Sequence, residues 1–501
     1  MANLKKVLAG TLGLCMAASM MTACGDSDSS SSSDSKSSNG GSKPANGNGI
    51  SSDADRPDTT TLHGAESSDA STQTLKFYCW NTEFKSRLDK YYEMGADALP
   101  VEKDADGSIT SINGVNIEWV QIENEGNAYQ KKLDDALAAQ KDSDDKVDMF
   151  LMEADYALKY ANGDVALSVQ DLGITGDDLS QMYQYTLDVA TDTASGELKG
   201  VSWQATPGLF MYNANYAKEV LGSDDPATVQ EAVKDWDAFT ETAAKMKEKG
   251  IFMVSGFDDT YRCYSNNVSN PWVVDNKVTV DPQIKAWVDQ TKEYTDKGYN
   301  NKTSLWDEAW AAGQKIDGKV FGYFYSTWGI PFCLLPYTLD TSVEDGGKEE
   351  VGNGGYGLWR ACEGPQAYYW GGTWICGAID SDNTDIVGNI MKVMTCDKEV
   401  AKAITEGEQD YTNNKAAIQE LIDGGYTNPF LGGQNHLALL TAAADKISLD
   451  NKISAYDQGC NEKFQGAMKD YFLGNTSSYE DALAAFKTAL SELYPTLEYD
   501  F

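Results

Sequence analysis

The chain has 501 residues, 41% of them hydrophobic, which is enough to bury the cores of two lobes or domains. Acidic residues number 77 and basic residues 40, so the formal net charge at pH 7 is -37. A surface this acidic repels nucleic acid and anionic membranes, which excludes both as ligands and leaves a neutral or cationic solute.

Residues 1–23 are predicted to be an export signal. Lys5 and Lys6 precede an apolar segment over 7–20 that is too short for a comfortable transmembrane span. A Met-Thr-Ala-Cys sequence follows and resembles a bacterial lipobox, which implies that Cys24 is lipidated and becomes the mature N-terminus. The alternative is an ordinary signal peptide with an incidental cysteine.

Residues 24–74 are predicted to form a flexible linker. They consist largely of serine, aspartate, glycine and asparagine, and their apolar content is too low to bury a core. A linker of this kind is expected between a lipid anchor and a folded body.

From Leu75 onward, short strand-like runs alternate with longer helical segments. Strands are expected at 75–80, 147–152 and 319–325, and helices at 84–94, 127–141 and 236–249. Ser477 and Glu480 form a capping box before a last apolar helix. The alternation predicts an α/β protein with mainly parallel sheets.

One acidic segment, residues 102–113, resembles a calcium-binding loop. Asp104, Asp106 and Gly107 fit that pattern, but Asn113 stands where a bidentate glutamate is required. A surface hairpin turn is therefore the preferred interpretation, and no metal site is predicted.

Seven cysteines follow Cys24, and they are interpreted mainly as small buried hydrophobic residues. Their number is odd and none forms a metal-type Cys-x-x-Cys pair. A disulfide between Cys362 and Cys376 remains an alternative.

Histidine-dependent catalysis is excluded by composition. His63 lies in the linker, so the folded body holds only His436. No nucleophile elbow, phosphate loop or dinucleotide fingerprint is present, and no cofactor is predicted. A glycoside hydrolase stays possible, because it needs only two carboxylates.

Aromatic and polar residues follow several predicted strands, where an open α/β sheet binds its ligands. Trp80 and Asn81 follow the first strand, Glu153 and Asp155 follow the strand ending at Met152, and Trp328 follows a later one. Such a combination suits a pyranose, whose C–H faces stack on rings while its hydroxyls bind amides and carboxylates.

Three segments together resemble extracellular solute-binding proteins of the maltose-binding type. Residues 201–213 are similar to the strand that crosses between the two lobes of those proteins and ends in Tyr-Asn. Residues 236–239 open a helix usual in that family, and 364–372 resemble the return toward the first lobe.

The resemblance implies a two-lobed periplasmic-binding-protein-like fold with hinge crossovers and a cleft between the lobes. The expected N-lobe comprises 75–205 plus 366–410, and the C-lobe 206–365 plus 411–501. The resemblance also implies that the protein is a monomer, binds a carbohydrate and docks on the permease subunits of an ABC importer.

Carried over residue by residue, the resemblance places Trp328 as the main stacking tryptophan and Asp155 as an acidic contact. Thr206 departs from the pattern, because maltose binders carry glutamate there, which argues against maltodextrin. Trp370 either widens the stacking surface or packs in the hinge. The full expected set is Trp80, Asn81, Thr82, Glu83, Glu153, Asp155, Thr206, Asn270, Trp272, Trp328, Trp370, Gln434 and Asn435.

Two other functional classes stay open at this stage: a cell-surface glycoside hydrolase, and an adhesin that tethers glycans without closing. For a transport receptor, polyamines and peptides are the alternative solutes. The acidic surface suits a polyamine, whereas tryptophans at strand ends favour a sugar.

Overall fold

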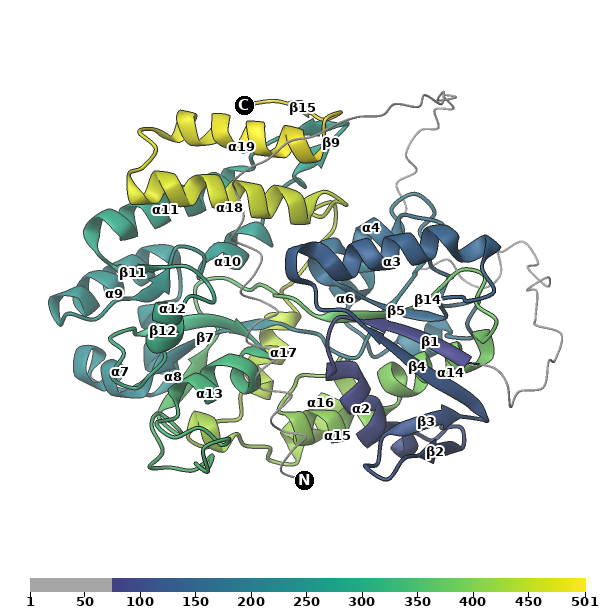
Figure 1. Cartoon of the computed structure of the whole chain (residues 1–501). Helices are drawn as coiled ribbons and strands as arrows, with labels where there is room; N and C mark the ends of the chain where they lie inside the picture. Colours follow the sequence, from purple (N-terminus) through teal and green to yellow (C-terminus); the bar gives the residue numbers. More distant parts are fainter. Residues whose placement is uncertain (1–73) are drawn as a thin grey trace.

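The computed structural model describes residues 74–501. Two α/β lobes lie side by side, each with its own sheet covered by helices (Figure 1). The predicted signal sequence, lipidated Cys24 and linker lie outside the described residues. Within residues 74–501, no helix combines the length and apolar character that a membrane crossing requires.

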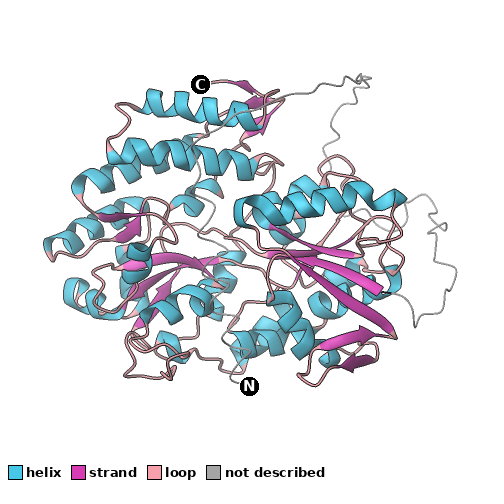
Figure 2. Cartoon of the chain, in the orientation of Figure 1, coloured by secondary structure: helices cyan, strands magenta, loops and turns pink. Residues whose placement is uncertain are grey.

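The first lobe contains a mixed seven-stranded sheet in the order β2-β3-β4-β1-β5-β14-β6. Its strands are drawn in magenta on the right of Figure 2. Only the pairs that β1 makes with β4 and β5 are parallel. The strands in chain order are β1 (Thr74–Cys79), β2 (Val101–Lys103), β3 (Ile109–Ile112), β4 (Val115–Gln121), β5 (Met149–Glu153), β6 (Val201–Ser202) and β14 (Thr373–Gly377).

The expectation of mainly parallel sheets is therefore wrong, for two physical reasons. Asn113 and Gly114, both with positive φ, form a two-residue turn that makes β3 and β4 an antiparallel hairpin. Strand β14 enters the sheet from the second lobe and so runs against β5. The preferred interpretation of 102–113 is confirmed, because β2 and β3 form a hairpin.

The second lobe contains three small sheets. Its central one has the antiparallel order β12-β7-β13, and β8 pairs in parallel with β11. The strands are β7 (Gly208–Asn213), β8 (Val254–Gly256), β9 (Val273–Val274), β10 (Lys277–Val278), β11 (Asn300–Thr303), β12 (Gly322–Ser326), β13 (Trp359–Cys362) and β15 (Glu498–Tyr499).

The helices predicted from apolar periodicity are confirmed within a few residues. They correspond to α2 (Glu83–Tyr91), α3 (Ala128–Ala139), α9 (Trp236–Glu248) and α19 (Tyr479–Leu493). The predicted capping box of α19 is wrong by one residue, because Ser478 is the N-cap and accepts from the amide of Asp481. Two further helices matter below: α10 (Tyr261–Ser265) and α18 (Asp457–Leu473).

The chain crosses between the seven-stranded sheet and the β12-β7-β13 sheet through extended segments. Residues 203–207 join β6 to β7, and 363–372 join β13 to β14. The two crossings lie against each other, since Pro207 forms a β-bridge with Tyr369 and Thr206 Oγ1 donates to the carbonyl of Gly371 at 2.8 Å. Thr206 has φ of 42°, and Gly371 also has positive φ. These crossings form the hinge.

A buried ionic network connects the hinge with both lobes. On α2, Arg87 Nη2 lies 3.0 Å from Glu83 Oε1 and 3.3 Å from Asp410 Oδ2. Gln204 Nε2 donates to the same two carboxylates at 2.9 and 3.0 Å, and Thr327 Oγ1 donates to Asp410 at 3.0 Å. The network therefore links the first lobe, a hinge crossing and the end of β12.

All seven cysteines in the described part of the chain are unpaired, and six are buried; only Cys396 is half-buried. Their interpretation as small buried hydrophobic residues is confirmed, and the alternative Cys362–Cys376 disulfide is not formed. Within residues 74–501 no group of His, Cys, Asp or Glu is arranged to hold a metal ion.

Candidate functional site

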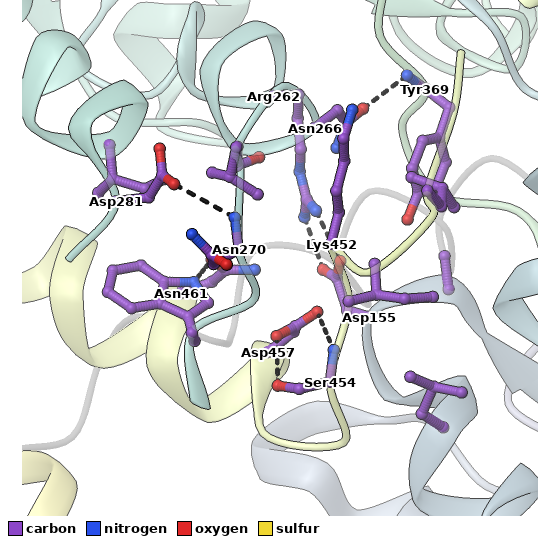
Figure 3. Close-up of a pocket in the computed structure, with 18 of the residues that line it drawn as sticks. Asp155, Arg262, Asn266, Asn270, Asp281, Tyr369, Lys452, Ser454, Asp457 and Asn461 are labelled. Atoms are coloured by element: carbon purple, nitrogen blue, oxygen red, sulfur yellow. Dashed lines mark hydrogen bonds and ion pairs between the residues drawn. The ribbon is translucent and has the colours of Figure 1, made fainter. Parts of the chain in front are cut away.

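A pocket lies between the lobes, and both contribute to its wall (Figure 3). The first lobe supplies Asp155 from η7 (Ala154–Tyr156), the turn that follows β5. The second supplies Arg262 from α10. The two form a bidentate ion pair, with Nη1–Oδ1 and Nη2–Oδ2 distances of 2.6 Å. Planar guanidinium and carboxylate groups fit each other in this geometry, so the pair fixes the two lobes against each other.

Internal hydrogen bonds shape the second-lobe wall of the pocket. Asn266 Oδ1 accepts from the amide of Tyr369 at 2.6 Å, and Asp281 Oδ2 accepts from the amide of Asn270 at 3.3 Å. Asn461 Oδ1 accepts from the indole N–H of Trp272 at 2.8 Å. Asn270 and Trp272 thus lie in the wall of the pocket, and Trp272 is buried with its ring against Phe464.

The pocket beside the Asp155–Arg262 pair is partly open, and its cavity volume is about 40 Å³. That volume holds a few water molecules and no sugar ring.

Three tryptophans gather beside the hinge. Trp328, which follows β12, lies 4.8 Å from Trp370 and 6.2 Å from Trp306 between ring centroids, and Trp306 lies 6.1 Å from Trp370. The indole N–H of Trp328 donates to the carbonyl of Trp370 at 2.9 Å. Trp306 and Trp370 keep partly exposed rings, so the cluster presents aromatic surface.

Glu153, the last residue of β5, joins this tryptophan cluster to the polar pocket. A side-chain carbon placed on Gly371 would lie 3.5 Å from Glu153 Oε1 and 3.2 Å from Trp328 Nε1. Because Gly371 has no side chain, the space between the Glu153 carboxyl and the Trp328 indole is not filled. Burial, and secondarily the charge of Asp155, raises the pKa of Glu153 to about 8. A protonated carboxyl can donate as well as accept a hydrogen bond.

Trp80 and Tyr156 form the first-lobe side of the site. Their ring centroids are 6.3 Å apart in a T-shaped arrangement. The hydroxyl of Tyr156 is buried and makes no hydrogen bond to the described residues. Burial, together with the neighbouring Glu153, keeps the pKa of this phenol well above its usual value, so the hydroxyl stays protonated.

The remaining predicted site residues have structural contacts. Asn81 accepts from the amide of Glu83, whose carboxylate belongs to the buried ionic network. Gln434 bonds both backbone groups of Ala361 on β13, and Asn435 accepts from the amide of Leu437. Thr206 is bound to the opposite hinge crossing, and the Thr82 side chain makes no hydrogen bond within residues 74–501.

Sequence reasoning missed Arg262 and Trp306. Both follow strands of the second lobe, β8 and β11, and the strand-end rule would have found them had those strands been predicted. Strand β11 reads Asn-Asn-Lys-Thr, which has no apolar alternation, and β8 has only three residues. Neither strand carries a periodic signal strong enough to detect.

The raised carboxyl pKa values predict that stability falls as pH rises. Burial raises the pKa of Glu153 to about 8 and those of Asp258 and Asp457 to about 7. Between pH 5 and about 7 for the two aspartates, and up to about 8 for Glu153, the folded protein holds protons that the unfolded chain has lost. As the pH rises through these ranges, each such proton lowers the free energy of unfolding by about 1.4 kcal/mol per pH unit.

Thermal unfolding at constant ionic strength should therefore give a lower melting temperature at pH 8 than at pH 5. Glu153→Gln should flatten this dependence between pH 6 and 8, because the amide does not titrate. A melting temperature that rises with pH over this range would contradict the assignment.

Comparison with known proteins gives a consistent result. The sequence profile of the bacterial extracellular solute-binding protein family matches residues 108–428. A structure described as an extracellular solute-binding protein of family 1 superposes with a TM-score of 0.65 at 18% identity, and the match covers 85% of this chain and 99% of that one. A search of curated protein sequences found no match.

Two further similar structures come from bifidobacteria. The ABC-transporter-associated binding protein of B. animalis subsp. lactis, in complex with β-1,6-galactobiose, has a TM-score of 0.58 at 15% identity and covers 86% of this chain and 100% of its own. The galacto-N-biose-/lacto-N-biose I-binding protein of Bifidobacterium longum, in complex with lacto-N-biose, has a TM-score of 0.58 at 12% identity, with 85% and 98% covered. These structures share the two-lobed fold of the chain.

Proposed function

Because the chain belongs to the bacterial extracellular solute-binding protein family, we propose that it captures a carbohydrate and delivers it to the permease subunits of an ABC importer. The observation that carries this proposal is the cluster of Trp328 and Trp370 beside Glu153, located where the two lobes meet. Rings stack on the C–H faces of a sugar, while carboxyl and phenol groups bind its hydroxyls.

Further support comes from the ligands of two structures with this fold, which are the disaccharides β-1,6-galactobiose and lacto-N-biose. The candidate site offers the corresponding chemistry: the indole faces of the tryptophan cluster and the Glu153 carboxyl. A disaccharide between the lobes would contact groups from both, so its binding favours the closed arrangement.

We propose binding without a catalytic step. A glycoside hydrolase needs two carboxyl groups on either side of the scissile bond. Next to Glu153, both oxygens of Asp155 are engaged by Arg262, so Asp155 is not free to serve as the second group.

The test is a thermal-shift and calorimetric screen of the purified protein with maltose, lacto-N-biose, β-1,6-galactobiose and their longer homologues. Spermidine and a short neutral peptide form the comparison arms. At least one sugar should raise the melting temperature and be recovered uncleaved. Binding confined to spermidine or the peptide, or cleavage of the sugar, would overturn the proposal.

Sugar binding should also close the lobes. We expect the radius of gyration from small-angle scattering to decrease at saturating sugar, since the sugar has greater affinity for the closed form. Scattering curves that coincide with and without a bound sugar would favour the adhesin alternative.

The family is extracellular, and we propose that a lipid at Cys24 holds the protein at the outer face of the membrane. The lobes are proposed as 75–205 plus 366–410 and 206–365 plus 411–501, in a monomer. Cys24→Ser should release the protein into the medium, because each buried acyl methylene contributes about 0.8 kcal/mol to anchoring. Complete retention of the variant on membranes would refute the anchor.

A further inference from the structure

We propose that Trp306 is a second stacking surface for the solute, held in a strained backbone conformation by neighbouring aspartates. This inference rests on the proposed function, since it assigns a further contact to the same site. The proposal above rests on solute contacts with Trp328, Trp370 and Glu153 and gives no role to Trp306.

The backbone of Trp306 has φ of 72°, in the left-handed region. That region is disfavoured for a bulky side chain and is occupied mainly by glycine, asparagine and aspartate. Such strain persists only where the surrounding structure imposes it, and it concentrates at functional sites. Folding alone does not account for tryptophan here, because glycine or asparagine would adopt this conformation at lower cost.

Three carboxylates impose the conformation of this segment. Asp258 Oδ2 accepts from the amide of Leu305 at 3.3 Å, and Asp307 Oδ2 accepts from the amide of Ser304 at 3.0 Å. Asp259 Oδ1 accepts from the indole N–H of Trp310 at 3.0 Å. Asp258 and Asp259 are themselves buried and follow β8, so they attach the segment before and after Trp306 to the second-lobe sheets.

The ring of Trp306 is placed differently from that of Trp310, four residues later. Trp310 is 1% exposed and packs in the core, whereas Trp306 covers it at a centroid distance of 5.1 Å and stays partly exposed. The Trp306 ring also lies within 6.2 Å of Trp328 and Trp370. It therefore extends the aromatic surface of the tryptophan cluster from the end of β12 toward the end of β11.

The test compares variants by calorimetric titration with whichever of maltose, lacto-N-biose and β-1,6-galactobiose binds the wild-type protein most tightly. Trp306→Ala should raise Kd about tenfold or more, and Trp306→Phe should give a smaller increase because a ring remains. Lys302→Ala is the matched control, since Lys302 is exposed, lies in the same segment and also has positive φ. Its Kd should stay at the wild-type value.

We assign Asp258 the role of positioning the segment that carries Trp306. Rescue of sugar binding by the conservative Asp258→Asn variant tests this role. Asp258→Ala should raise Kd by removing the acceptor for Leu305, while Asp258→Asn should restore the wild-type Kd because its amide oxygen still accepts. Equal Kd values for wild type, Trp306→Ala and Trp306→Phe would overturn this inference and leave the proposed function intact. Failure of the wild-type protein to bind any of the three sugars would overturn both.

Discussion

Arg87→Ala should lower the free energy of unfolding by about 3–5 kcal/mol, because it leaves two buried carboxylates without their cation. Arg87 is 4% exposed and is the only cation that contacts Glu83 or Asp410 among the ion pairs of the described residues. Chemical denaturation with two optical probes measures the change.

Acid should restore part of the stability lost in this variant. Burial already raises the pKa of Glu83, and removal of the nearby Arg87 charge raises it further, so the carboxyl becomes neutral at a higher pH. Lys85→Ala is the matched control on the same helix, because the Lys85–Asp89 pair is partly exposed and worth at most about 1 kcal/mol. If Arg87→Ala and Lys85→Ala lowered the free energy of unfolding equally, the buried ionic network would not be important for stability.

Trp328→Ala should weaken sugar binding by about 2–4 kcal/mol, or roughly thirty- to a thousandfold in Kd, as truncation of a central aromatic anchor does. Trp328 lies at the centre of the tryptophan cluster and is close to both Trp370 and Glu153. Trp328→Phe should be intermediate, since the smaller ring still stacks but loses the hydrogen bond to the Trp370 carbonyl.

Trp328 is 8% exposed, so the alanine variant also loses some stability, and calorimetry must be performed where the variant is fully folded. Trp359→Ala is the control for a core tryptophan. Trp359 is fully buried and bonded to Thr338, and its loss should cost about 3–5 kcal/mol of stability with unchanged Kd for the folded protein. If Trp328→Ala left the Kd for sugar unchanged, the sugar site would not lie at the tryptophan cluster.

Much of the fold could be predicted from periodicity, because α2, α3, α9 and β5 each carry an apolar pattern that their burial explains. The rule that ligands lie beyond strand ends selected Glu153, Asp155 and Trp328, and the structure brings both Asp155 and Trp328 near Glu153. Strand direction was predicted wrongly, because it depends on which lobe a strand enters from. The sequence near β14 contains no local pattern that indicates from which lobe this strand enters the sheet.

The contacts of Glu83 could not be predicted for a similar reason. Its position after the first strand suggested a solute contact, but Asp410 and Gln204 arrive from segments far along the chain and enclose it. Long-range partners of this kind determine whether a polar residue at a strand end is free or already bound. Resemblance to a family does not specify them.

The buried cysteines have a consequence for how the protein matures outside the cell. Burial raises the pKa of Cys79 and Cys362 to about 12 and that of Cys396 to about 11, so almost no thiolate exists at neutral pH. Thiolate is the species that reacts with oxidants and disulfides. Because none of the seven cysteines in residues 74–501 is paired, we expect the two lobes to fold without a thiol oxidase. The scarcity of thiolate should make the folded protein behave alike in air and under anoxic, sulfide-containing conditions.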